Sequence, residues 1–125
     1  MSTGRHLEAR EAELAVLGAI FLDNAAFDRI GDVVTADDFY APRHRTIFQT
    51  MLALAEQGEP IDTVTVATAL ERENQLEDVG GMEYLASLDQ VSASAVNVAY
   101  HAEIVHDMAE VRRLMTACAD VMGKA

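Results

Sequence analysis

Apolar residues in this chain recur every three or four positions, which is the period of an α-helix that packs by one face. Between Glu8 and Leu22, six apolar positions fall at helical spacing: Ala12, Ala15, Val16, Ala19, Ile20 and Phe21. No stretch alternates apolar and polar residues for long enough to indicate a β-strand. The two prolines and seven glycines fall at the ends of periodic segments rather than every eight to twelve residues. The pattern therefore predicts an all-α fold.

Helix boundary signals divide the first half of the chain. Asp23 and Asn24 end the first helix and can cap a second. Thr35 has the character of an N-cap for the turn TADDFY, where carboxylates suit the helix dipole. Pro42 is suited to the start of a longer helix to about Gln57. The expected inward positions are Ala26, Phe27, Ile30, Val33 and Val34 in the second helix, and Ile47, Phe48, Met51, Leu52, Leu54 and Ala55 in the longer one.

Similar signals continue in the second half. Asp62 is a good N-cap for the segment TVTVATALEREN, which we predict to be helical although its Thr and Val residues favour a strand weakly. Gly80 and Gly81 open a short helix that carries Tyr84, Leu85 and Leu88. Ser92 and Ser94 are expected in a loop that caps a last helix from about Ala95 to Met122.

The last helix carries an apolar seam with alternating four- and three-residue steps: Ile104, Met108, Val111, Met115, Cys118 and Met122. Such a seam is typical of a helix that packs along its length against a partner helix. We therefore expect three parts: a mobile tail at 1–7, a helical globular head at 8–94, and the first helix of a helical hairpin at 95–125. The second hairpin helix would follow Ala125.

Composition narrows the class of protein. Nine Lys and Arg residues face 21 Asp and Glu residues, a net charge of −12, so a general nucleic-acid-binding surface is not expected. A single cysteine forms no internal disulfide, and no basic and apolar leader segment precedes Glu8. No apolar run reaches the ~18–20 residues of a membrane span. These features favour a cytoplasmic protein that does not interact with membranes.

Two sets of residues suggest chemistry. Glu103 and His106 have the spacing of a di-iron ligand pair, but only one such pair is present and His101 diverges from His106 around the helix. Cys118 lies in the apolar seam, where core packing is expected rather than nucleophilic chemistry. A small metal- or thiol-dependent helical enzyme built on Glu103, His106 and Cys118 remains the alternative to a non-catalytic domain.

Other polar residues have plainer interpretations. His44, between two arginines, could act as an acid/base group or contact an anion, but we expect it to anchor a helix start or to pair locally. The carboxylate pairs at 37–38 and 77–78 occur where caps and turns are expected, and we expect them to be solvated. The chain contains neither G-x-x-x-x-G-K-[ST] nor G-x-G-x-x-G. We predict no catalytic, cofactor-binding or metal site.

Five segments occur in a recognisable order: EAELAVLGAIFLDNAAFD, DDFY, HRTIFQTMLALAEQGEPIDTVTVATALE, LEDVGGMEYLASL and NVAYHAEIVHDMAEVRRLM. Together they resemble the N-terminal domain of the bacterial replicative DNA helicase family, DnaB, over residues 8–122. The resemblance implies a helical head followed by a helical hairpin. It also implies assembly of these domains into a collar on a hexameric ring, with the apolar seam in self-association.

The resemblance assigns partners as well. ATP, Mg²⁺ and the DNA-translocating loops would belong to a C-terminal motor domain, and DNA primase would dock on the collar, with a helicase loader as a further candidate partner. Glu11 and Tyr84 match positions that the family uses at its primase-facing surface. The plainer interpretations are a first-turn carboxylate for Glu11 and a core aromatic with its hydroxyl in water for Tyr84. A stand-alone adaptor with the same head is another alternative.

Overall fold

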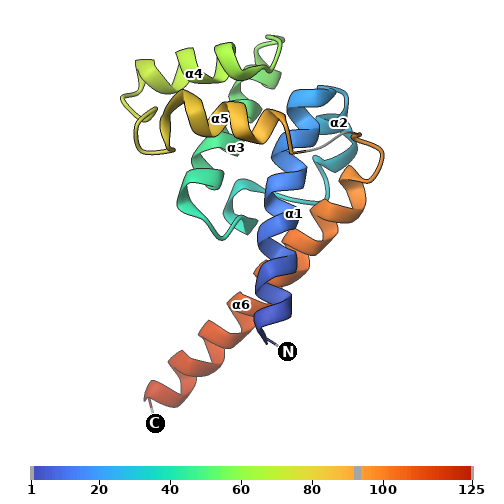
Figure 1. The fold of residues 1–125 in the computed structure, drawn as a ribbon. Helices are drawn as coiled ribbons and strands as arrows, with labels where there is room; N and C mark the ends of the chain where they lie inside the picture. Colours follow the sequence, from blue (N-terminus) through green and yellow to red (C-terminus); the bar gives the residue numbers. More distant parts are fainter. Residues whose placement is uncertain (1, 92–93, 125) are drawn as a thin grey trace.

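The computed structural model describes residues 2–91 and 94–124, and within these residues the regular structure is entirely helical (Figure 1). The predicted all-α fold is therefore confirmed. The elements in chain order are α1 (Ser2–Leu22), α2 (Ala26–Ile30), the 3₁₀ turn η1 (Ala36–Asp38), α3 (Pro42–Glu56), α4 (Thr63–Arg72), α5 (Gly81–Asp89) and α6 (Val98–Lys124).

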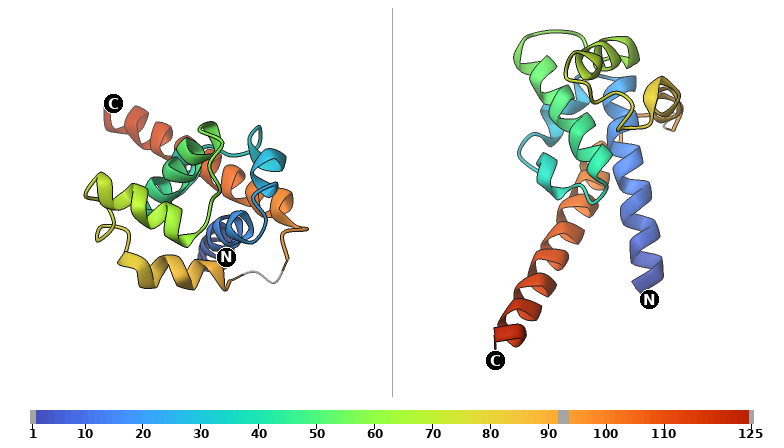
Figure 2. Two further views of the ribbon diagram at one scale, coloured as in Figure 1. Left: turned by 90° about the horizontal axis from the view of Figure 1, so that it is seen from above. Right: turned by 90° about the vertical axis from the view of Figure 1, so that its left-hand side faces the viewer.

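Helix α1 is the centre of the molecule. It packs most extensively against α6 and next against α5, while α4 contacts both α3 and α5. Figure 2 shows that α1 and α6 run in opposite directions and diverge towards the two termini. The second half of α6 projects beyond the other helices, so the molecule has a head and an extended helical arm.

The core is continuous and takes buried side chains from all six α-helices. It is lined by large side chains that are almost completely buried, among them Val16, Leu17, Ile20, Ile30, Ile47 and Met51. The Phe48 ring stacks on Phe27 with centroids 5.3 Å apart and lies 4.9 Å from Phe39. The inward positions predicted from the helical period are thus mostly confirmed; Leu52 and Ala55 are exceptions because both are exposed.

The predicted caps were mostly correct. Pro42 begins α3, and the carboxylate of Asp62 accepts a hydrogen bond from the Thr65 N–H at 2.8 Å at the start of α4. The expected cap of the second helix was wrong: Ala25 is the N-cap residue of α2 and no side chain caps it, while Asp23 Oδ1 accepts a hydrogen bond from the Ala25 N–H at 3.0 Å in the turn before the helix. Asn24 has a different role from capping: its amide donates to the carbonyls of Ile20 and Ile61, which ties the end of α1 to the segment before α4.

Only glycine fits at position 80, because of its backbone conformation and because of the close approach of Tyr84. Its φ of +106° is unfavourable for residues with a Cβ, and a Cβ at this position would lie 2.8 Å from the Cβ of Tyr84. This close approach sets the position of Tyr84 in the first turn of α5. The glycine therefore bears directly on a residue of the predicted primase-facing surface.

Two predicted boundaries were wrong. The segment 1–7 was expected to be a mobile tail, but α1 begins at Ser2, so residues 2–7 are helical. The last helix was expected from Ala95 and begins at Val98. Ser94 Oγ accepts a hydrogen bond from the Val96 N–H at 3.1 Å, so this serine stabilises the turn before α6. Ser92 lies outside the described residues.

Helix α6 packs on the head through a face of small and β-branched residues, Val98, Ala102, Val105 and Ala109, all of them buried. The predicted seam lies beside this face: Ile104, Met108 and Val111 are half-buried, whereas Met115, Cys118 and Met122 are exposed. Among the described helices, none is both long and apolar enough to cross a membrane. The second half of α6 thus carries apolar side chains that the head does not cover.

Candidate functional site

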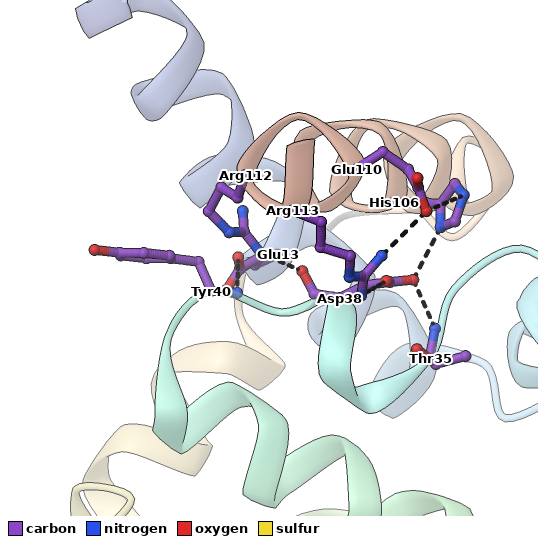
Figure 3. A network of polar contacts seen from close by, with 8 residues as sticks. All are labelled: Glu13, Thr35, Asp38, Tyr40, His106, Glu110, Arg112 and Arg113. Carbon is purple, nitrogen blue, oxygen red and sulfur yellow. Dashed lines mark hydrogen bonds and ion pairs between the residues drawn. The ribbon is translucent and has the colours of Figure 1, made fainter. Parts of the chain in front are cut away.

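A buried carboxylate joins the head to α6 (Figure 3). Asp38, at the end of η1, is only 2% exposed. Its Oδ1 accepts a hydrogen bond from Arg113 Nη2 at 2.6 Å, and its Oδ2 lies 3.1 Å from His106 Nδ1. The Thr35 N–H donates to the same Oδ2 at 3.0 Å. One side chain of the head therefore contacts two residues of α6 that lie two turns apart.

A second layer of contacts surrounds Asp38. Arg112 Nη2 donates to the Asp38 carbonyl at 2.8 Å, and the Arg112 guanidinium lies over the Tyr40 ring. Glu110 pairs with Arg113 at 3.1 Å and lies 3.7 Å from His106 Nε2. These contacts, which we call the Asp38 node, hold the middle of α6 against η1 at a defined position.

Charge in the Asp38 node is balanced by hydrogen bonding. Burial alone would raise the pKa of Asp38, but hydrogen bonds from the Thr35 N–H, Arg113 and His106 outweigh it and the pKa is lowered. The same hydrogen bond with Asp38 raises the pKa of His106. At neutral pH the carboxylate is therefore ionised and accepts from every donor that faces it.

The burial of Asp38 corrects the expectation that the carboxylates at 37–38 are solvated. Asp37 is exposed, as are Glu77 and Asp78. The spacing of Thr35 and Asp38 is typical of a capping pair, which could have indicated the local hydrogen bond. This local spacing carries no information on the contacts with α6, because His106 and Arg113 lie 68 and 75 positions after Asp38 in the sequence.

A second group of hydrogen-bonded side chains, Glu13, His44 and Tyr84, crosses the head from α1 to α5. The Glu13 carboxylate, 3% exposed, accepts hydrogen bonds from the Tyr40 N–H and from His44 Nδ1, both at 2.7 Å. His44 Nε2 lies 2.5 Å from the Tyr84 hydroxyl. Both ring nitrogens of His44 are thus occupied within the fold. His44 anchors the start of α3, as expected, rather than offering an unpaired base for catalysis.

The two predicted primase-facing residues have different surroundings. Tyr84 is half-buried, and the Arg43 guanidinium carbon lies 3.9 Å from its ring centroid. Burial raises the pKa of Tyr84, against the opposing effect of Arg43. Its hydroxyl meets His44 and so has a hydrogen-bond partner within the fold. Glu11 is exposed and lines a shallow pocket with Tyr100.

The residues of the alternative enzyme do not converge. Glu103 is exposed, His106 belongs to the Asp38 node, and Cys118 is exposed on the projecting half of α6. The expected core packing of Cys118 was wrong because α6 has left the head before this position. Among the side chains that the structure describes, at 9–91 and 94–123, no three His, Cys, Asp or Glu residues gather to hold a metal ion.

Known proteins are similar to this chain in sequence and in fold. A family model described as the DnaB-like helicase N-terminal domain matches residues 5–107. The replicative DNA helicase DnaB of Geobacillus stearothermophilus is 43% identical over 111 residues, which are 89% of this chain and 24% of that protein. The chain therefore spans about a quarter of the length of this curated relative.

Solved structures extend the comparison. The N-terminal domain of DnaB helicase from Mycobacterium tuberculosis superposes with a TM-score of 0.88 at 37% identity, covering 90% of this chain and 78% of that one. The N-terminal domain from Helicobacter pylori, whose structure was described with its interactions with primase, has a TM-score of 0.82 at 22% identity, covering 99% and 96%. With a family model that matches most of its length, this chain belongs to the DnaB-like helicase N-terminal domain family.

Proposed function

We propose that this chain is the non-catalytic N-terminal assembly and primase-docking domain of a hexameric, ATP-dependent replicative DNA helicase, acting in the cytoplasm at the replication fork. Family membership and the quarter-length match to replicative helicases support this role. We assign ATP and Mg²⁺ to a motor domain, since these 125 residues contain no glycine-rich phosphate-binding motif. A helicase loader is a further proposed partner.

The observation that carries the assembly role is the apolar arm formed by the projecting half of α6. Its large exposed side chains are Leu114, Met115, Val121 and Met122, of which Met115 is 67% and Met122 is 77% exposed. Burying one such side chain contributes roughly 1.5–3 kcal/mol, so a helix that covered several of them would bind firmly. We propose that the second helix of a hairpin and neighbouring copies cover this arm.

The Asp38 node supports the same role. Charge-assisted hydrogen bonds from Arg113 and His106 to a buried carboxylate fix the middle of α6 on the head. A helix held in this way presents its far end in a defined direction. Assembly surfaces that are positioned before binding lose less conformational entropy when they associate.

Primase docking is proposed for the surface that includes Glu11 and Tyr84. The relative from Helicobacter pylori was studied with primase, and its N-terminal domain has the fold of this chain. Tyr84 combines an apolar ring with a polar tip that is already oriented by His44. Tyrosine in such surroundings is common among the residues that dominate protein interfaces.

The docking role is tested by titrating the complete helicase with the primase of the same organism and measuring the dissociation constant by calorimetry. The Glu11→Lys variant should bind at least fivefold more weakly, because it places a cation where an exposed carboxylate lies. Glu59→Lys, an exposed glutamate after α3, is the matched control and should bind normally. Absence of binding by the unmodified helicase would contradict the docking role.

A further inference from the structure

A cavity of about 320 Å³ lies between α1, the start of α3 and the middle of α6. Ala9, Ala41 and Met108 give it apolar walls. Arg10 and Arg43 also line it and are exposed, so their side chains border its opening. Its volume falls within the range of pockets that accommodate a small ligand or a large side chain of a partner.

The charge of this cavity is opposite to that of the chain. Three of the nine basic residues, Arg10, Arg43 and Arg112, line it, although the net charge of the chain is −12. Glu13 is an acidic residue in the lining, and its carboxylate already accepts hydrogen bonds from the Tyr40 N–H and His44. An incoming anion would therefore meet guanidinium groups.

Two of the three arginines are held in place. Arg43 lies over the Tyr84 ring at 3.9 Å, and Arg112 lies over the Tyr40 ring while it donates to the Asp38 carbonyl. Arginines positioned in this way lose less side-chain entropy when they pair with a carboxylate. The cavity thus offers apolar walls next to oriented cations.

We propose that this cavity receives an apolar side chain of the primase, whose neighbouring Asp or Glu residues pair with Arg10 and Arg43. The inference rests on the proposed docking function and deepens it by naming the site and the chemistry of the partner segment. A protein segment fits better than a small anion, because the walls are apolar and Arg43 makes the cavity continuous with Tyr84. An apolar anchor surrounded by a polar rim is the usual form of an interface hot spot.

The inference is tested with three variants of the complete helicase, titrated with primase at two salt concentrations. Arg10→Glu should weaken binding at least tenfold, because it repels a carboxylate, and should reduce the salt dependence. Met108→Ala should weaken binding without altering the salt dependence. Arg72→Glu, an exposed arginine at the end of α4, is the control and should bind within twofold of the parent. Circular dichroism and thermal unfolding confirm that each variant is folded.

The outcomes separate the inference from the docking role. If the parent binds primase and both Arg10→Glu and Met108→Ala bind equally well, the cavity is not the site and the docking role stands. Tighter binding by Arg10→Glu would show a basic partner segment and overturn the inference. The inference would also be overturned if Arg10→Glu lost affinity for single-stranded DNA while keeping its affinity for primase. If the parent does not bind primase, both the docking role and the inference about the cavity are wrong.

Discussion

Asp38 Oδ1 lies 2.6 Å from Arg113 Nη2, and this ion pair joins η1 to α6 across 75 positions of sequence. Asp38 is buried, whereas the Arg113 side chain is about half exposed, so the anion is the fixed partner and the cation reaches to it. His106, two turns earlier on α6, contacts the other carboxylate oxygen. The position of α6 on the head therefore depends on a single carboxylate as well as on apolar packing.

Replacing Asp38 with Asn should destabilise the domain by roughly 2 kcal/mol, because it removes the charge that strengthens the hydrogen bonds from Arg113 and His106. Urea unfolding measures this loss, and amide hydrogen exchange should show faster exchange in the first half of α6. Asp37→Asn changes the exposed neighbour and should leave stability within about 0.5 kcal/mol of the parent. Equal effects of the two substitutions would show that the Asp38 node contributes nothing of its own.

Stability should fall as the pH rises above 6.5. The hydrogen bond with Asp38 raises the pKa of His106 above its usual 6.5, so the folded state binds this proton more tightly than the unfolded state. The stability that protonated His106 contributes is fully present below pH 6.5, and it is lost as the pH rises through the pKa of His106 in the folded state. The size is modest because the His106 side chain is partly exposed. Unfolding the parent and His106→Asn across this range should show a slope that the variant lacks.

The stability that Asp38 contributes depends on pH in the opposite direction, because it is lost in acid. Its pKa is lowered from the usual 3.8, so the stability it contributes is present above 3.8 and is lost as the pH falls through the folded-state pKa. Acid unfolding of Asp38→Asn should therefore depend less steeply on pH than that of the parent. Identical acid transitions in the two proteins would contradict this origin of the pH dependence.

Glu13→Gln should cost about 3 kcal/mol, because an amide donor would face donors that now bind the carboxylate, namely the Tyr40 N–H and His44. Chemical unfolding measures the loss, and in a Tyr40→Phe, Tyr100→Phe background, where Tyr84 is the one remaining tyrosine, its fluorescence should report the displacement of His44. Glu11→Gln, two residues earlier and exposed, serves as the control and should unfold like the parent. A Glu13→Gln protein that is as stable as the parent and has an unchanged Tyr84 signal would show that the hydrogen bonds among Glu13, His44 and Tyr84 do not stabilise the fold.

Local signals predicted the helices well. The roles of Pro42 and Asp62 depend only on residues within one turn, so the sequence could indicate them. The partners of Asp38 and His44 could not be predicted in the same way, because each lies on another helix far along the chain. The α1 segment at 2–7 also has no strong start signal in the sequence.

The apolar seam of the last helix was predicted from its largest residues, and it lies beside the face that packs on the head. Helix α6 packs on the head through Ala102 and Ala109 together with Val98 and Val105, all of them buried, and small side chains let helices approach closely. Large residues such as Met115 and Met122 therefore remain outside the head. The role proposed for them in self-association is a prediction that the fold of one chain does not test.

Sedimentation velocity of the complete helicase carrying both Met115→Asp and Met122→Asp tests the assembly role most directly. These side chains are exposed on the projecting half of α6, so the head should stay folded and helical. Val64→Asp, which places the same charge at a 62% exposed apolar residue of α4, is the matched control. We expect the double variant to dissociate into smaller species at concentrations where the parent and Val64→Asp remain hexameric. An unchanged hexamer in the double variant would contradict the account.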